Sequence, residues 1–208
     1  MNYNYQIMTN IIRERKSVRK YDPNFKLTKD DLAELISEAT EAPSSSNLQP
    51  WRFLVIQDAD AKKKIREFSF NQEQIETSSA IIAVLGDTEM YHNIDRIYHS
   101  NLEAGFVDEA NMERQISNAK ALYPNAPLQA RLHIAAFDAG LISMQIMLLA
   151  KAKGLDTVCM GGFDKQAFSE AFHVEDRYAP IVLIAIGKAA APAYGSTRLP
   201  LEDIATFL

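Results

Sequence analysis

Residues 42–53 have the sequence Ala-Pro-Ser-Ser-Ser-Asn-Leu-Gln-Pro-Trp-Arg-Phe, a polar loop that runs directly into an apolar segment. The loop concentrates hydroxyl and amide groups in a short length of chain, and Pro43 and Pro50 restrict the backbone on either side of it. Such a loop suits a flat ligand with polar edges, although serine, asparagine and proline are also ordinary turn residues. In either case the loop joins a predicted helix to a predicted strand.

Hydrophobic periodicity predicts helices and strands along most of the chain. Thr28 and Asp31 resemble a capping box that opens a helix of roughly 29–41. A long helix is expected at about 126–153, with Gly154 as its stop signal. Its apolar residues are spaced for burial, and they are Ile134, Phe137, Leu141, Met144 and Leu148. Strands are expected at 51–57, 81–85, 156–160 and 180–187, and further helices at about 5–15, 61–70 and 164–172.

Composition limits the class of protein. The 208 residues carry a formal net charge of -5, which argues against a nucleic-acid-binding protein. The single cysteine, Cys159, allows no internal disulfide and fits a reducing cytoplasm, and we expect it to be buried. We find no secretory signal, and Asp138 interrupts an apolar run that is short for a bilayer. We therefore expect one cytoplasmic domain over residues 1–208 that does not bind a membrane.

A basic segment, Arg15-Lys16-Ser17-Val18-Arg19, follows the first predicted helix. In an extended backbone, Arg15, Ser17 and Arg19 point to one face, where two guanidiniums and a hydroxyl can bind one phosphate. A solvated basic patch after a helix is the alternative. Farther along the chain, the pair Gly161-Gly162 either lets the backbone approach a ligand closely or forms a tight turn.

Five sequence blocks, in matching order and spacing, resemble the FMN-dependent nitroreductase family over almost the whole chain. The blocks are Arg15 to Arg19, Ala42 to Phe53, Asn71, Gly161-Gly162-Phe163-Asp164 and Ser196-Thr197-Arg198-Leu199-Pro200. The resemblance implies an α+β fold with a mixed central sheet surrounded by helices. It also implies a homodimer with two FMN molecules at its interface, each bound by both chains, and a C-terminal tail exchanged between the subunits.

The resemblance also assigns cofactor-binding residues, whereas no catalytic side chain and no metal ligand is expected. The matching positions are Arg15, Lys16, Ser17, Arg19, Pro43, Ser44, Ser45, Asn47, Gln49, Asn71, Gly161, Gly162 and Arg198. In the family, the first block binds the flavin and the counterpart of Arg198 contacts its phosphate. The serine loop serves the flavin of the other subunit. The counterpart of Asn71 bonds the pyrimidine edge of the ring, and the glycine pair faces the flavin N5.

The implied activity is electron transfer from NADH or NADPH to a nitroaromatic, a quinone or a similar small acceptor. Reductant and acceptor would use one face of the flavin in turn, which is a ping-pong mechanism. Dehalogenation, flavin fragmentation and FMN binding without turnover are the alternatives. Some relatives carry an acidic residue at the position of Gly161 and basic residues at those of Gln74 and Ser196, so flavin potential and nucleotide preference can differ here. Residues 87–126, expected to cover the pocket, carry no transferable motif.

Overall fold

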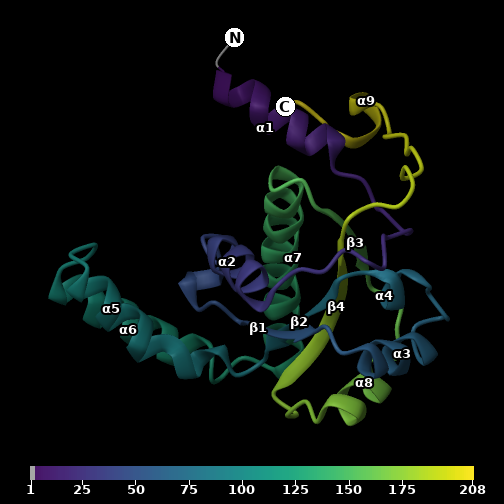
Figure 1. The fold of residues 1–208 in the computed structure, drawn as a ribbon. Helices are drawn as coiled ribbons and strands as arrows, with labels where there is room; N and C mark the ends of the chain where they lie inside the picture. Colours follow the sequence, from purple (N-terminus) through teal and green to yellow (C-terminus); the bar gives the residue numbers. More distant parts are fainter. Residues whose placement is uncertain (1–2) are drawn as a thin grey trace.

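The fold is described for residues 3–208 of a computed structural model, in which helices surround a four-stranded sheet (Figure 1). The strands are β1 (Trp51–Ile56), β2 (Ala80–Asp87), β3 (Asp156–Met160) and β4 (Tyr178–Gly187), in the spatial order β1-β2-β4-β3. The α+β class is confirmed, but the expected mixed sheet is wrong for these ladders, because every neighbouring pair is antiparallel. A single bridge between Ser17 and Thr157 is the parallel pairing found among the described residues.

Nine α-helices are found in residues 3–208. They are α1 (Tyr3–Glu14), α2 (Lys29–Ala39), α3 (Ala59–Glu67), α4 (Gln74–Thr77), α5 (Ile94–Glu103), α6 (Glu109–Leu122), α7 (Leu128–Ala152), α8 (Lys165–Phe172) and α9 (Leu201–Ile204). The capping box of α2 is present, since the Asp31 N–H donates to Thr28 Oγ1 at 3.1 Å and the Thr28 N–H donates to Asp31 Oδ2 at 2.8 Å. Sequence analysis missed α4 and α9, which are single turns, and α5, which buries only Ile94 and Tyr98.

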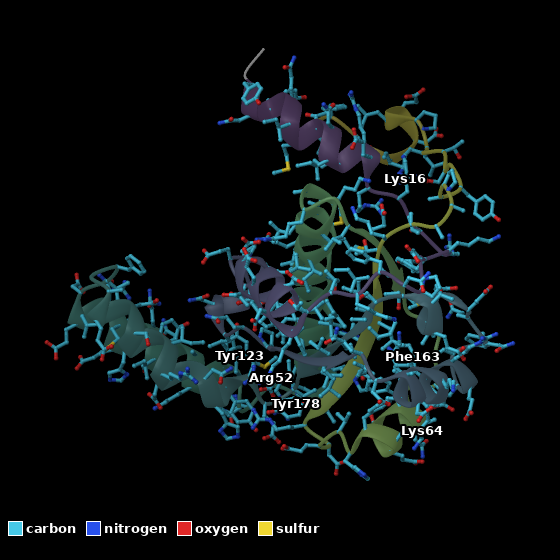
Figure 2. The ribbon with its side chains drawn as sticks, viewed as in Figure 1. Lys16, Arg52, Lys64, Tyr123, Phe163 and Tyr178 are labelled. Atoms are coloured by element: carbon cyan, nitrogen blue, oxygen red, sulfur yellow. The ribbon has the colours of Figure 1, made fainter. Side chains whose placement is uncertain are left out.

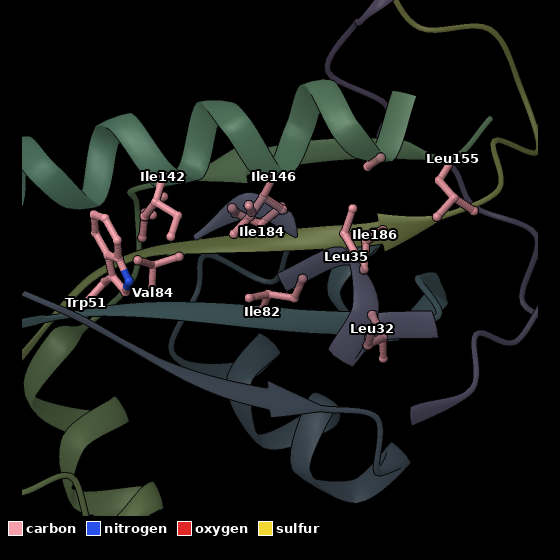
Figure 3. Packing of buried hydrophobic residues seen from close by; sticks show 14 of the residues in the cluster. Leu32, Leu35, Trp51, Ile82, Val84, Ile142, Ile146, Leu155, Ile184 and Ile186 are labelled. Atoms are coloured by element: carbon pink, nitrogen blue, oxygen red, sulfur yellow. The ribbon is translucent and has the colours of Figure 1, made fainter. Parts of the chain in front are cut away.

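Helix α7 lies on one face of the sheet through a surface of mostly small side chains. Its buried residues are Ala135, Asp138, Ala139, Ile142, Ser143, Ile146 and Ala150. Figure 3 shows Ile142 and Ile146 packed over Val84 and Ile184 of the sheet. By length and hydropathy alone α7 could span a bilayer, but in this structure its buried face covers the sheet.

The prediction of which face of α7 is buried is therefore wrong. Phe137 is 64% exposed and Met144 is 38% exposed, while Ile134, Leu141 and Leu148 are only partly buried. The physical reason is that alanine and serine let the helix backbone approach the sheet closely, so the bulkier side chains point away from it. Phe137 and Met144 thus lie on an outer surface, while Ile142 and Ile146 are the large residues of α7 that enter the core.

Helices also cover the opposite face of the sheet. Ile65 of α3, Ile75 of α4 and Phe168 of α8 pack with Ile81 and Leu183 in a second buried cluster. Alternate residues of β2 and β4 enter the two clusters, as the period of two in a strand requires. With both faces covered, these central strands are apolar along their length even though they are antiparallel.

Two parts of the chain stand away from the sheet and its covering helices (Figure 1). One is the α5–α6 pair, and the other consists of α1 together with the C-terminal tail that carries α9. None of the 12 residues of α1, all of them described, is buried. Its exposed apolar residues are Tyr3, Tyr5, Ile7, Met8 and Ile12. An isolated helix of this length is only marginally stable in water, and the apolar residues of α1 are left exposed in the described chain.

Candidate active site

The basic segment after α1 crosses the end of β3 in an extended conformation. The Val18 N–H donates to the Thr157 carbonyl at 3.0 Å, and the Tyr21 hydroxyl donates to the Ala185 carbonyl at 3.2 Å. Val18 and Tyr21 are buried and anchor the segment, whereas Arg19 is exposed. Burial raises the pKa of Tyr21 well above its usual range, so this anchor stays protonated and keeps its hydrogen bond.

A cavity of about 300 Å³ opens beside this segment. Its polar lining residues are Ser17, Arg19, Lys20, Glu73, Gln74 and Tyr194. Ser17 and Arg19 share one cavity, as the alternation of residues 15–19 predicts. The Nε atom of Arg15 is buried, and among the described residues it has no hydrogen-bond partner. Since an unsatisfied buried donor costs free energy, this guanidinium is suited to an anionic ligand.

The segment around Asn71 lies against the glycine pair. The Gln72 side chain donates to the Gly162 carbonyl at 3.2 Å, and a Cβ atom at Gly162 would lie 3.3 Å from the ring of Phe70. Phe70 itself is 82% exposed, and both Phe70 and Asn71 have positive φ angles. A Cβ atom at Gly161 would meet nothing within 4 Å, so the backbone there faces open space.

Asp138, fully buried on α7, holds the serine loop in place. The Ser45 N–H donates to Asp138 Oδ2 at 3.0 Å, and the Ser45 hydroxyl donates to Oδ1 at 3.1 Å. Tyr98 of α5 donates to the Ser46 carbonyl at 3.0 Å, and the hydroxyls of Ser46 and Tyr123 are 2.7 Å apart. The sequence did not predict these contacts with Asp138, Tyr98 and Tyr123. The one feature that could have indicated a role for Asp138 was the presence of a carboxylate inside an apolar helix.

The two halves of the predicted site lie at opposite edges of the sheet. The serine loop leads into β1, and the basic segment is bridged to β3. Three strand spacings, about 14 Å, separate these edges. Figure 2 shows the same separation, with Tyr123 and Arg52 far from Lys16.

The remaining predicted residues fall into these two groups or outside them. Ser17 and Arg19 meet at the cavity, and Asn71 lies near Gly162. Pro43 is exposed at the start of the serine loop. Arg198 lies in the exposed tail, where its guanidinium donates to the Ser196 hydroxyl at 2.8 Å and the Thr197 carbonyl at 2.7 Å. Cys159, expected to be buried, is instead exposed on the edge strand β3.

Comparison with known proteins assigns this arrangement to a family. Residues 12–188 match the model of the Nitroreductase family. The chain belongs to the nitroreductase family. It is 44% identical over 197 residues to a Bacillus subtilis protein provisionally named NAD(P)H nitroreductase YdgI, a match that covers 94% of each chain. The family resemblance predicted from the sequence is therefore confirmed, and the expected enzyme class is the one in that relative's name.

Two further nitroreductase-family relatives bear on the ligand. A solved structure from Exiguobacterium sibiricum, provisionally described as a nitroreductase in complex with FMN, is 43% identical, covers 97% of each chain and superposes with a TM-score of 0.92. The "CLA biosynthesis enone reductase" of Lactiplantibacillus plantarum is 32% identical over 204 residues, which is 97% of this chain and 94% of that protein.

The residues of this nitroreductase-family chain fit FMN, which is a flat ring that carries a phosphate. The buried and unpartnered Arg15 Nε suits the phosphate, and Ser17 and Arg19 of the same segment line a cavity. The exposed ring of Phe70 and the open space at Gly161 leave room for a planar group beside the glycine pair. These features lie on the β3 side of the sheet, at the edge opposite the serine loop.

The buried carboxyl of Asp138 gives the protein a testable pH dependence. Burial raises its pKa, and the hydrogen bonds from Ser45 oppose that shift only in part. The folded state therefore binds this proton more tightly than the unfolded chain does. The stability contributed by this group is fully present below the unfolded pKa and is lost as the pH rises through the raised folded pKa. Asp138→Asn, which cannot ionise, should lose more stability relative to wild type at pH 4 than at pH 7.

Urea denaturation of both proteins at pH 4 and pH 7 measures this difference. Ser45→Ala is the companion variant, because it removes a hydrogen bond that lowers the Asp138 pKa. In this variant the stability contributed by protonated Asp138 should be lost at a higher pH than in wild type. A stability difference between wild type and Asp138→Asn that is the same at both pH values would contradict the assignment.

Proposed function

We propose that the protein is an FMN-dependent oxidoreductase that passes electrons from NADH or NADPH to nitroaromatic, quinone or similar small acceptors. The observation that carries the proposal is the basic segment, in which the buried Nε of Arg15 has no described hydrogen-bond partner and Ser17 and Arg19 line a cavity. When bound, FMN supplies the hydride-transfer chemistry, and the protein supplies binding, position and charge. The one exposed cysteine fits a cytoplasmic location, and we infer that residues 1–208 form one domain.

Each group of site residues has a separate role in this proposal. Arg15, Ser17 and Arg198 bind the phosphate dianion, because guanidiniums match its geometry. Lys16 and Arg19 add positive charge, which lowers the energy of negative charge on a reduced ring. Asn71 bonds the edge of the ring, and Gly161-Gly162 leaves its reactive face approachable.

The site is completed, we infer, by a second copy of the chain. The tail exposes Leu199, Leu201, Ile204 and Phe207. The outer edge of β1 borders a groove of about 500 Å³, lined in part by Leu32, Ile36 and Val55. An open strand edge beside an apolar groove is a pairing site, and the exchanged tail of a partner supplies the missing strand. Such a homodimer carries the serine loop of Pro43, Ser44, Ser45, Asn47 and Gln49 to the flavin of the partner subunit.

Enone reduction is a second candidate activity. It is favoured by the enone reductase named above, which shares the family and nearly the whole chain length. Hydride addition to an activated double bond needs the same reduced cofactor as hydride addition to a nitro group or a quinone. The two candidates therefore differ in the acceptor and not in the cofactor site, and product analysis separates them.

The first prediction concerns the phosphate. Arg15→Ala should weaken FMN binding by about tenfold or more, the value of one charge-assisted hydrogen bond, and should leave riboflavin binding almost unchanged. Fluorescence titration of the apoprotein with both flavins measures this. Arg13→Ala, in the last turn of α1, is the matched control and should bind both flavins as wild type does. Equal losses for FMN and riboflavin in Arg15→Ala would show a folding defect instead.

The second prediction concerns turnover. Initial rates of NADH or NADPH oxidation with menadione should give parallel double-reciprocal lines, because reductant and acceptor use the site in turn. Gly161→Val should retain FMN but slow flavin reduction by about tenfold or more, since the branched side chain fills the open approach. Stopped-flow bleaching of the flavin absorbance measures that rate. If the flavin of Gly161→Val were reduced as fast as that of wild type, Gly161 would not lie on the path by which the reductant approaches the flavin.

The third prediction concerns assembly. Deleting residues 199–208 should convert the dimer to a monomer and release most of the FMN, because the tail would no longer fill the β1 groove of the partner. Val55→Asp, which places a charge on that groove without shortening the tail, should have the same effect. Light scattering with flavin absorbance measures both results. A truncated protein that remained dimeric and fully flavinated would exclude the exchanged tail.

A further inference from the structure

A larger cavity, of about 450 Å³, lies beside the serine loop, at the edge of the sheet away from the basic segment. The polar groups that line it include Asn47, Gln49, Arg52, Arg96, Ser100 and Asn101. Arg96 and Ser100 are four residues apart on α5, so one face of that helix lines the cavity. Among the described residues no acidic side chain lines it. The volume is in the range of small-molecule sites.

The positive charge of this cavity is not neutralised by the protein around it. Arg52 lies 3.6 Å from the buried carboxylate of Asp87, but that carboxylate already binds Arg177 through two hydrogen bonds of 3.1 and 2.6 Å. Two guanidiniums therefore share one negative charge. In the described structure no carboxylate pairs with Arg96, and the neighbouring Asp95 pairs instead with Lys120 at 2.7 Å.

One wall of the cavity is a strained and rigid piece of backbone. Ser46, Asn47 and Gln49 all have positive φ angles, between 49° and 55°, and none of them is glycine. Such conformations are costly and cluster at ligand sites. Here the Asp138 carboxylate and the hydroxyls of Tyr98 and Tyr123 hold the loop in this conformation. Asn47 and Gln49 of this loop line the same cavity as the two arginines, and the Gln49 side chain donates to Asn47 Oδ1 at 3.3 Å.

We propose that this cavity binds an anionic group, either a carboxylate or a phosphate, of the small molecule that exchanges electrons with the flavin. The inference rests on the proposed function, because the serine loop reaches a flavin only in the proposed dimer. Planar guanidiniums bind carboxylate and phosphate oxygens in a bidentate manner. Asn101 adds a neutral donor, whereas the Ser100 hydroxyl already donates to the Arg96 carbonyl at 2.9 Å. The carboxylate of an acceptor and the 2′-phosphate of NADPH share this chemistry, and the experiment distinguishes them.

The test compares Arg96→Gln with wild type, because Arg96 lines the cavity and makes no described ion pair that its loss would break. Arg114→Gln is the matched control: Arg114 is also an exposed arginine, on α6, and it bonds Asn111 outside this cavity. Two acceptors, the anion 4-nitrobenzoate and its uncharged methyl ester, are titrated by calorimetry into the protein as purified with its flavin. In parallel, KM for NADPH and for NADH is measured with uncharged menadione.

If the anion is a carboxylate, Arg96→Gln should bind 4-nitrobenzoate about tenfold more weakly, while the ester and the Arg114→Gln control match wild type. If it is the phosphate, KM for NADPH should rise about tenfold while KM for NADH and the affinity for 4-nitrobenzoate stay unchanged. Either result supports the cavity and names its ligand. Three results overturn the proposal. Arg96→Gln could leave the affinities for 4-nitrobenzoate and its ester and the KM values for NADPH and NADH all unchanged, or it could change both affinities or both KM values equally. The third is that Arg114→Gln has the same effects as Arg96→Gln. Failure of wild type to oxidise either nucleotide with menadione would refute the proposed function. Calorimetry would still show whether the cavity binds the 4-nitrobenzoate anion.

Discussion

The close packing of α7 on the sheet is the constraint on which the rest of the structure depends. Its buried face is built largely from alanine, serine and two isoleucines, so the helix backbone lies near β2 and β4. The same packing brings Asp138 to the serine loop, where its carboxylate accepts two hydrogen bonds from Ser45. It also turns Phe137 and Met144 outward. One helix therefore stabilises the core, fixes the loop and presents an apolar outer surface.

Several parts of the described chain leave apolar surface or a strand edge uncovered. α1 has no buried residue, the tail is exposed, and the edge of β1 borders an open groove. The serine loop and the basic segment, which the family resemblance assigns to one kind of site, lie at opposite edges of the sheet. In the proposed homodimer, a second copy would cover the apolar surfaces and bring the two halves together.

Charge is distributed between the same two edges. On the β3 side, the unpartnered Nε of Arg15 and the exposed Arg19 suit a phosphate. On the β1 side, Arg52 and Arg177 share the buried Asp87, and Arg96 makes no described ion pair. A protein with a net charge of -5 thus places arginines at both cavities, although Glu73 also lines the one on the β3 side. This arrangement favours small anionic ligands at both edges.

The sequence by itself determined the family, the four strands, the capped helix α2 and the gathering of Ser17 and Arg19 on one face, because these depend on local periodicity and motif spacing. Only the tertiary structure decided which face of α7 is buried, that Asp138 holds Ser45, and that Arg52 shares Asp87 with Arg177. Those features join residues far apart in the chain. Helical spacing of the bulky residues predicts one buried face of α7, but close approach of the backbone to the sheet selects a face with smaller side chains.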